Sequence, residues 1–297
     1  MRTEQINPRY LELDTWSATE MIAAMYEEQL AAAAAVRGAL GAITAAVEDA
    51  VPALQRGGRI VYAGAGTSGR IGVQDGSELP PTFDWPADRL VFAMAGGLDA
   101  LVRSAEGAED NDAAGAQAMA EAKIGADDVV IGIAASGTTP FTIGILRASS
   151  AAGAVTIAVA NNPDAPLFAA ARHRILADTG SEVIAGSTRM KAGTAQKIVL
   201  TLFSTAVMVK MGRVYRGLMV DMWARNAKLR RRAEAIVSEI VRCPAGDAAR
   251  HLEQADGDVK TAILIGFGLG RGEAAQLLQR HGGNLRSAIH ESKGKDG

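Results

Sequence analysis

Residues 59–83 read RIVYAGAGTSGRIGVQDGSELPPTF, and this stretch predicts a strand, a tight turn and the first turns of a helix. The apolar run 60–63 ends in a cluster of glycines that encloses Thr67 and Ser68. Helix-compatible sequence follows until Pro80 and Pro81 end it. Glycines let the backbone approach a ligand closely, and the free N–H groups and dipole of a helix N-terminus favour an anion. The stretch therefore predicts an anion-binding turn.

The spacing of Gly64, Gly66 and Gly69 also matches the dinucleotide-binding fingerprint. That fingerprint needs an acidic residue at the end of the second strand, roughly 20 residues further on, to bind the ribose. The second apolar run, 90–94, continues into Ala-Gly-Gly at 95–97 with no acid at its end. We therefore favour a phosphate over a dinucleotide as the anion.

The composition excludes several classes of protein. The chain has 297 residues, 48% of them hydrophobic, which is enough for one large domain and a smaller one. A net charge of −2 and only 4% aromatic residues argue against a nucleic-acid partner. The single cysteine, Cys243, and four scattered histidines predict neither a disulfide framework nor a metal site.

The apolar segments favour a cytoplasmic protein without a membrane partner. The first 14 residues are polar and lack the apolar centre of a signal peptide. The longest apolar segment, 198–209, is shorter than the ~20 residues that span a bilayer.

Short apolar runs alternate with helix-compatible stretches through the middle of the chain. This alternation predicts an α/β fold with a doubly wound, five-stranded parallel sheet of flavodoxin-like order and helices on both faces. We expect helices at about 99–122 and 140–150, and strands at 60–63, 90–94, 129–134, 155–160 and 174–177.

The flanking regions read as helical. We divide the chain into an N-terminal helical arm (1–49), a sugar-phosphate-binding domain (50–213) and a C-terminal helical region (214–297). Ser17 and Glu20 form a potential capping box at the start of a helix. Towards the C-terminus we expect helices over about 187–211 and 220–240, then a small bundle of short helices. We identify no internal repeat at a solenoid period.

Two hydroxyl-rich loops mark the expected site. Residues 64–69 follow the first strand and 136–140 follow the third. In a sheet of order 2-1-3-4-5 these two loops flank the crevice at which ligands bind. Together they predict a site for a small phosphorylated, polyhydroxylated ligand. The alternative for each loop alone is an ordinary turn with a Ser or Thr helix cap.

Four acids are candidates for proton transfer. Glu78 ends the helix that begins at the first loop. Glu106, Glu109 and Asp110 have the i, i+3, i+4 spacing of one helical face, which usually means a solvated surface. Two carboxylates beside a phosphate site could instead act as general acid and general base. The spacing does not choose among the four.

Five motifs resemble the N-acetylmuramic acid 6-phosphate etherase family of the sugar isomerase (SIS) superfamily. They are GAGTSGR at 64–70, SELPP at 77–81, EGAED at 106–110, GIAASG at 132–137 and GSEVIAGSTRMKAGTAQK at 180–197. The resemblance implies a homodimeric carbon–oxygen lyase that uses no metal or other cofactor. Such a lyase converts N-acetylmuramic acid 6-phosphate to N-acetylglucosamine 6-phosphate and D-lactate during cell-wall amino-sugar recycling.

The resemblance also implies roles for residues of this chain. Glu78 matches the proton-donating glutamate of the family and Glu109 its second catalytic glutamate. The expected substrate contacts are Gly66, Thr67, Ser68, Ser136, Gly137, Thr138, Thr139, Glu182, Ser187 and Lys191. Thr138 departs from the family, many members of which carry arginine there. Two alternatives remain open: a SIS-domain sugar-phosphate isomerase, and a non-catalytic regulator that senses a sugar phosphate.

Overall fold

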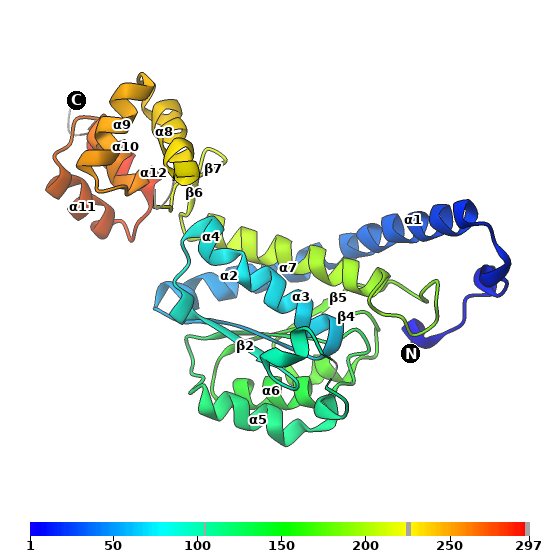
Figure 1. The fold of residues 1–297 in the computed structure, drawn as a ribbon. Coiled ribbons are helices and arrows are strands. Elements are labelled where there is room, and N and C mark those ends of the chain that lie inside the picture. Colours follow the sequence, from blue (N-terminus) through cyan, green and yellow to red (C-terminus); the bar gives the residue numbers. More distant parts are fainter. Residues whose placement is uncertain (104, 224–226, 295–297) are drawn as a thin grey trace. The chain divides into compact units, whose positions relative to one another are not determined.

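A computed structural model describes residues 1–103, 105–223 and 227–294, which form two compact units (Figure 1). The sheet unit comprises Met1–Ser77 and Ala87–Thr205. The helical unit comprises Glu78–Pro86 and Ala206–Gly297. The nine-residue segment 78–86 therefore belongs with the C-terminal helices, although it interrupts the sequence of the sheet unit.

The predicted sheet is confirmed. Five parallel strands lie in the order β2-β1-β3-β4-β5. Every residue of β1, β3 and β4 is buried, as expected of parallel strands covered on both faces. The strands are β1 (Ile60–Gly64), β2 (Leu90–Met94), β3 (Val129–Ile133), β4 (Val155–Ala160) and β5 (His173–Leu176).

Helices cover both faces of this sheet (Figure 1). The helices α5 (Asp112–Glu121) and α6 (Pro140–Ala151) pack against each other and form one layer. The other layer contains α2 (Leu40–Gln55), α3 (Gly66–Ser77) and α7 (Lys191–Lys210). At the carboxyl edge, β1 and β3 each end in a loop that leads directly into a helix, α3 and α6 respectively.

The N-terminal region is helical, as expected, and forms two helices. The helix α1 (Ala18–Ala35) begins with the predicted capping box between Ser17 and Glu20, and a 3₁₀ turn at Val36–Ala39 separates it from α2. Only Ala24 and Ala32 of α1 are buried. The preceding arm, residues 1–16, consists of 3₁₀ turns at Arg2–Glu4, Pro8–Tyr10 and Leu13–Thr15.

Two stretches are long and apolar enough to cross a membrane by length and composition alone: residues 18–55 and α7. More than half of the α7 stretch is buried inside the fold, which fits the core helix of a soluble protein. Residues 18–55 are interrupted by the 3₁₀ turn, and α2 contributes six buried residues to the fold.

Helix boundaries differ from the prediction at two functional segments. The helix expected over 99–122 begins only at Asp112, after 3₁₀ turns at Leu98–Leu101 and Ala108–Asp110. Gly107 adopts φ +72° and the side chain of Asn111 caps α5, so Glu106, Glu109 and Asp110 lie on a loop rather than on a helical face. The helix expected from Ser187 begins at Lys191.

The helical unit also differs from the prediction near its start. A hairpin of β6 (Val214–Tyr215) and β7 (Leu218–Met219) precedes α8 (Ala227–Val241). The helix expected over 220–240 thus begins later, and its residues 224–226 lie outside the described residues. Trp223 instead forms an isolated bridge with Asp258.

The helical unit contains an internal repeat, so our prediction of no repeat was wrong. Residues 246–263 and 272–289 are identical at seven of 18 positions with an offset of 26. The first copy covers α9 (Ala245–Gln254) and α10 (Val259–Gly266), and the second covers α11 (Arg271–Arg280) and α12 (Leu285–Gly294). Asp258 and Asn284, equivalent in the two copies, both accept a backbone N–H at the start of the second helix. The repeat therefore conserves its helix cap.

Candidate functional site

A pocket of about 460 Å³ lies at the carboxyl ends of β1 and β3, where the strand order reverses. This is the position expected for a ligand in a sheet of this topology. Five segments of the sheet unit contribute: the two loops after β1 and β3, the turn before α5, the loop before α7 and the N-terminal arm. The polar lining residues are Glu4, Thr67, Ser68, Glu109, Asp110, Ser136, Thr138, Thr139 and Thr188.

The loop after β1 places the N-terminus of α3 at this pocket. Gly64 and Gly69 approach so closely that a Cβ atom on Gly64 would lie 2.9 Å from the backbone nitrogen of Gly69. Gly66 turns the chain into the helix at φ +51°. As a result Gly66, Thr67 and Ser68, which are predicted substrate contacts, all line the pocket. The N–H groups of this first helical turn have no acceptor within the helix and are available to an anion.

The loop after β3 contributes a second helix N-terminus. Ser136, Thr138 and Thr139 line the pocket, and Thr139 is the cap residue before α6. The Ser136 hydroxyl accepts hydrogen bonds from the Thr138 backbone N–H at 3.2 Å and from its hydroxyl at 3.0 Å. Gly137 adopts φ +72°, and a Cβ atom added to it would clash with the Cβ of Ala165 at 2.2 Å. It shapes this loop without lining the pocket.

The acids predicted for catalysis occupy different places. Glu109 and the neighbouring Asp110 line the pocket from the turn before α5. Glu78 is exposed, follows the last residue of α3, and is not among the described residues that line this pocket. Twelve helical residues, about 18 Å at 1.5 Å per residue, separate the two ends of α3. Glu109 therefore lies at the pocket, and Glu78 follows the end of α3 opposite the one that lines it.

Arg70 holds the 3₁₀ turn that follows β2 and lies beside the turn that carries Glu109. A neighbouring hollow of about 310 Å³ is lined by Arg70, Glu106 and Glu109 among others. The Arg70 guanidinium donates to the carbonyl oxygens of Leu101 at 3.0 Å and Ala100 at 2.9 Å. The arginine of the GAGTSGR motif therefore fixes the segment after β2.

The long motif at 180–197 builds the start of α7. Glu182 is fully buried and accepts the backbone N–H groups of Lys191 and Ala192, both at 2.9 Å. Burial raises the pKa of Glu182 despite these hydrogen bonds. The Lys191 ammonium pairs with Glu28 of α1. The pocket is lined by Thr188 of this segment, whereas Glu182 joins the segment to the start of α7 and Lys191 joins α7 to α1. Ser187 is half-buried just beside Thr188.

Two lining residues, Glu4 and Thr188, were missed in the sequence. Glu4 reaches the pocket from the first 3₁₀ turn of the arm, more than sixty residues before the nearest loop of the site. No local pattern indicates this placement. The side chain of Asn162, which follows β4, forms hydrogen bonds with Arg2 and Thr3. Because a buried amide needs hydrogen-bond partners, this asparagine is the feature of the sequence that comes nearest to indicating where the arm binds.

The charge of the pocket is unusual for an anion site. Its described lining residues include three carboxylates, Glu4, Glu109 and Asp110, and no lysine, arginine or histidine. Thr138 occupies the position at which the resemblance would allow an arginine. A bound phosphate would accordingly depend on hydroxyl groups and two helix N-termini.

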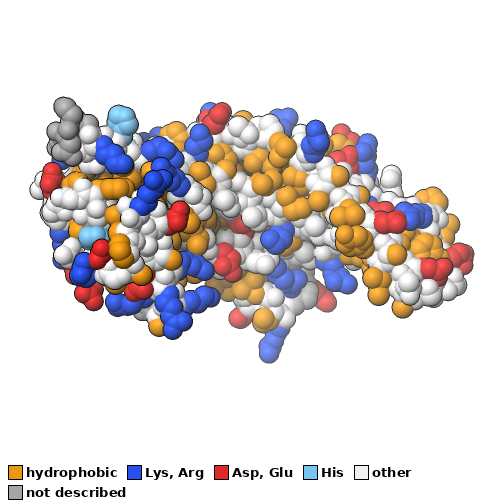
Figure 2. Space-filling model, turned by 90° about the horizontal axis from the view of Figure 1, so that it is seen from above, with side chains coloured by type: hydrophobic (Ala, Val, Ile, Leu, Met, Phe, Trp, Pro, Cys, Tyr) orange, Lys and Arg blue, Asp and Glu red, His pale blue; other side chains and the backbone are white. Residues whose placement is uncertain are grey.

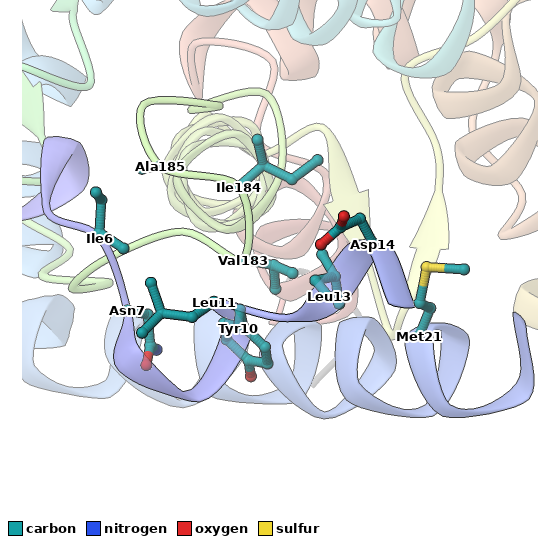
Figure 3. A pocket seen from close by; sticks show the side chains of 10 residues that line it. All are labelled: Ile6, Asn7, Tyr10, Leu11, Leu13, Asp14, Met21, Val183, Ile184 and Ala185. Atoms are coloured by element: carbon teal, nitrogen blue, oxygen red, sulfur yellow. The ribbon is translucent and has the colours of Figure 1, made fainter. Parts of the chain in front are cut away.

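A second, mostly apolar hollow of about 410 Å³ lies between the arm, α1 and the loop 183–185 (Figure 3). Asp14 is the sole charged side chain among the described residues that line it. Ile6, Leu11 and Ile184 at this hollow are each more than half exposed. Its lining does not suit a sugar phosphate.

Comparison with known families agrees with this architecture. The SIS domain model matches residues 108–206, and the model of the glucokinase regulatory protein N-terminal SIS domain matches residues 42–150. Among solved structures, a phosphoheptose isomerase from Francisella tularensis superposes with a TM-score of 0.50 at 16% identity. That superposition covers 65% of this chain and all of the isomerase, and it confirms the SIS fold.

Similarity to curated proteins extends over nearly the whole chain. The N-acetylmuramic acid 6-phosphate etherase of Deinococcus radiodurans is 50% identical over 98% of this chain and 96% of its own. That of Halalkalibacterium halodurans is 44% identical over 98% of each chain. On this similarity, and with the SIS sheet in place, the chain belongs to the N-acetylmuramic acid 6-phosphate etherase family.

Proposed function

We propose that this protein cleaves the D-lactyl ether of N-acetylmuramic acid 6-phosphate, producing N-acetylglucosamine 6-phosphate and D-lactate in the recycling of peptidoglycan amino sugars. Membership of the etherase family supports the substrate. The observation that carries the proposal is the pocket itself, in which Glu109 faces two hydroxyl-rich helix N-termini. Such a pocket offers a site for a phosphate and a proton-transfer group for the sugar.

The phosphate is proposed to bind where α3 and α6 begin. Thr67 and Ser68 on one side and Ser136, Thr138 and Thr139 on the other supply neutral donors. Gly66 lets the backbone of the first loop come close to the ligand, and Gly137, at φ +72°, shapes the second loop and remains a predicted contact. The weaker candidates Glu182, Ser187 and Lys191 remain predictions, with an indirect role through the arm for Glu182 and Lys191.

The reaction needs two proton-transfer groups. Opening of the sugar ring exposes an aldehyde at C1, which acidifies the hydrogen at C2. Glu109 removes that proton as the electron pair forms a C2=C3 double bond and the C3–O bond breaks. Glu78 supplies the proton to the departing lactyl oxygen. Water then adds to C3 and a proton returns to C2, so that one water is consumed for each ether cleaved.

We also propose that the protein is a homodimer and that it acts in the cytoplasm. Apolar side chains are exposed along α1 and the arm, on the right-hand side of Figure 2, and they include Ile22, Tyr26 and Leu30. An exposed apolar helix face of this kind is typical of a protein–protein interface. We further propose that residues 50–213 bind the sugar phosphate, with 1–49 and 214–297 as the flanking helical regions.

The test is product analysis in heavy-oxygen water with purified protein and N-acetylmuramic acid 6-phosphate. We expect free D-lactate without label and N-acetylglucosamine 6-phosphate labelled at C3, because water re-adds to that carbon. Label in the lactate instead would show that a different bond is broken. Release of an isomerised sugar phosphate, or recovery of unchanged substrate in a stoichiometric complex, would reject the etherase in favour of an isomerase or a sensor.

A further inference from the structure

The first residues of the arm are fixed to the carboxyl edge of the sheet. The Arg2 N–H donates to the side-chain oxygen of Asn162 at 2.7 Å, and the Arg2 guanidinium pairs with Asp178. Thr3 is fully buried, and its hydroxyl accepts a hydrogen bond from the Asn162 amide at 3.1 Å. The same amide donates to the Ala135 carbonyl at 2.9 Å, beside the loop after β3. These contacts fix the backbone on the N-terminal side of Glu4.

The loop before α7 makes room for the Glu4 carboxylate. Gly186 donates its N–H to the Thr3 carbonyl at 3.0 Å and adopts φ +76°. A Cβ atom on Gly186 would lie 2.8 Å from Oε2 of Glu4. The hydrogen bond between Gly186 and Thr3 thus holds Glu4 beside the loop before α7. Glu4 there lines the same pocket as Glu109 and Thr188.

The pocket offers few groups that can move a proton. Among the described residues that line it, these are Glu4, Glu109 and Asp110. His173, the sole histidine in the sequence of the sheet unit, has its Nε2 2.8 Å from Asp49 and opens β5 at the opposite edge of the sheet. Glu109 and Asp110 are neighbours on one turn, whereas Glu4 comes from a separate segment. Ring opening needs a proton acceptor at the anomeric hydroxyl, an atom of the sugar different from the C2 hydrogen on which Glu109 is proposed to act.

We propose that Glu4 is the proton acceptor at the anomeric hydroxyl when the sugar ring opens in this pocket. Glu4 takes the proton of the C1 hydroxyl, the O1 electron pair forms the C1=O double bond, and the C1–O5 bond breaks. O5 receives a proton from water, and Glu4 returns its proton to the hydroxide that remains. The assignment rests on the proposed function only in that the ligand is a cyclic sugar phosphate.

The test measures ring opening separately from ether cleavage. The full-length protein is mixed with N-acetylglucosamine 6-phosphate, and the exchange of its α and β anomers is followed by NMR magnetisation transfer. Wild type is expected to accelerate this exchange. Glu4→Gln should lose about 100-fold of the acceleration, the scale of one general base, with the Kd for the sugar phosphate within a few-fold of wild type. Glu109→Gln should retain the exchange while losing lactate release.

Matched variants distinguish this role from a structural one. Glu12→Gln, an exposed arm residue outside the lining of the pocket, should behave as wild type. Glu4→Asp should recover part of the exchange, and Gly186→Ala should slow it with Glu4 itself intact. Anomer exchange in Glu4→Gln at the wild-type rate would overturn the proposal, as would a wild-type protein that does not accelerate exchange. Exchange without lactate release by wild type would instead leave Glu4 in place and reject the etherase.

Discussion

The two units hold the two carboxylates of the proposed reaction in different ways. In the sheet unit, Glu109 lies on a short turn and lines a pocket that this unit builds by itself. In the helical unit, Glu78 begins the segment 78–86, whose Trp85 is 1% exposed and stacks with Arg213 at 5.0 Å. The difference indicates that ligand binding can be set by the sheet unit alone, whereas the second proton-transfer group depends on packing in the helical unit.

The largest expected effect is the loss of turnover when either carboxylate is neutralised. Glu78→Gln and Glu109→Gln should each lower kcat by about 10²- to 10⁴-fold, because each removes one general acid–base group. Both residues lie on short turns near the surface, so unfolding by urea should match wild type. The measurement is D-lactate release at saturating substrate.

Sugar-phosphate binding should distinguish Glu109→Gln from Glu78→Gln, because Glu109 belongs to the sheet unit and Glu78 to the helical unit. Glu109→Gln should change the Kd for N-acetylglucosamine 6-phosphate, because its side chain lines the pocket. Glu78→Gln should leave that Kd unchanged. Wild-type turnover in either variant would reject the assignment. Recovery of activity on mixing the two inactive proteins would show that the carboxylates act from different chains.

Much of the sheet unit could be predicted because its signals are local. The apolar run before Gly64 and the glycines after it define a strand, a turn and a helix within one short stretch. The same order of apolar run, loop and helix recurs at β3 and α6. The helix expected across 99–111 failed for a local reason too, since Gly107 at φ +72° and the Asn111 cap override its alanine-rich composition.

The features that were missed depend on contacts between distant residues. Glu4 reaches the pocket because Asn162, 159 positions after Thr3 and 160 after Arg2, fixes the arm. Glu182 and Lys191 remain predicted ligand contacts, but the sequence did not indicate their partners in the fold, which are the start of α7 and Glu28. The repeat of the helical unit was hidden by conservative exchanges such as Asp258 for Asn284, and became plain when both proved to be helix caps.

A smaller effect is expected from the arginine that holds the segment of Glu78. Arg213 donates to the carbonyl oxygens of Phe83 at 2.6 Å and Asp84 at 3.1 Å, and pairs with Asp221 at 3.2 Å. Lys260 also pairs with Asp221, at 3.1 Å. Arg213→Met should cost about 2 kcal/mol of unfolding free energy, less than the loss of an isolated buried pair because Lys260 still neutralises Asp221.

Arg213→Met should also lower kcat about tenfold, because displacement of Glu78 should raise the activation free energy by roughly 1.4 kcal/mol. The Kd for N-acetylglucosamine 6-phosphate should stay unchanged. Arg271→Met is the control, because Arg271 pairs with Asp256 at the surface of the same unit. Weaker sugar-phosphate binding in Arg213→Met, with kcat preserved, would contradict the division of roles between the units.

The smallest expected effect concerns the arm that carries Glu4, and it depends on pH. The Tyr10 hydroxyl donates to Glu28 at 2.7 Å, and Glu28 also pairs with Lys191. Burial, together with this hydrogen bond, raises the pKa of Tyr10 to about 12. Burial alone would raise the pKa of Glu28, but the hydrogen bonds from Lys191 and Tyr10 lower it. The folded arm therefore favours a neutral phenol beside an ionised carboxylate.

Because the folded pKa of Tyr10 lies above its usual 10, its contribution is complete below pH 10 and is lost as the pH rises towards 12. Tyr10→Phe should lower the unfolding free energy by about 1 kcal/mol at pH 9, the value of one hydrogen bond, and this difference should shrink through pH 10.5 and 11.5 in urea titrations. Tyr26→Phe, at an exposed position of α1, should show no difference at any pH. If the difference in unfolding free energy between Tyr10→Phe and wild type stays constant over this range, Tyr10 contributes packing alone. The attachment of the arm to α1 then does not depend on the proton of the Tyr10 hydroxyl.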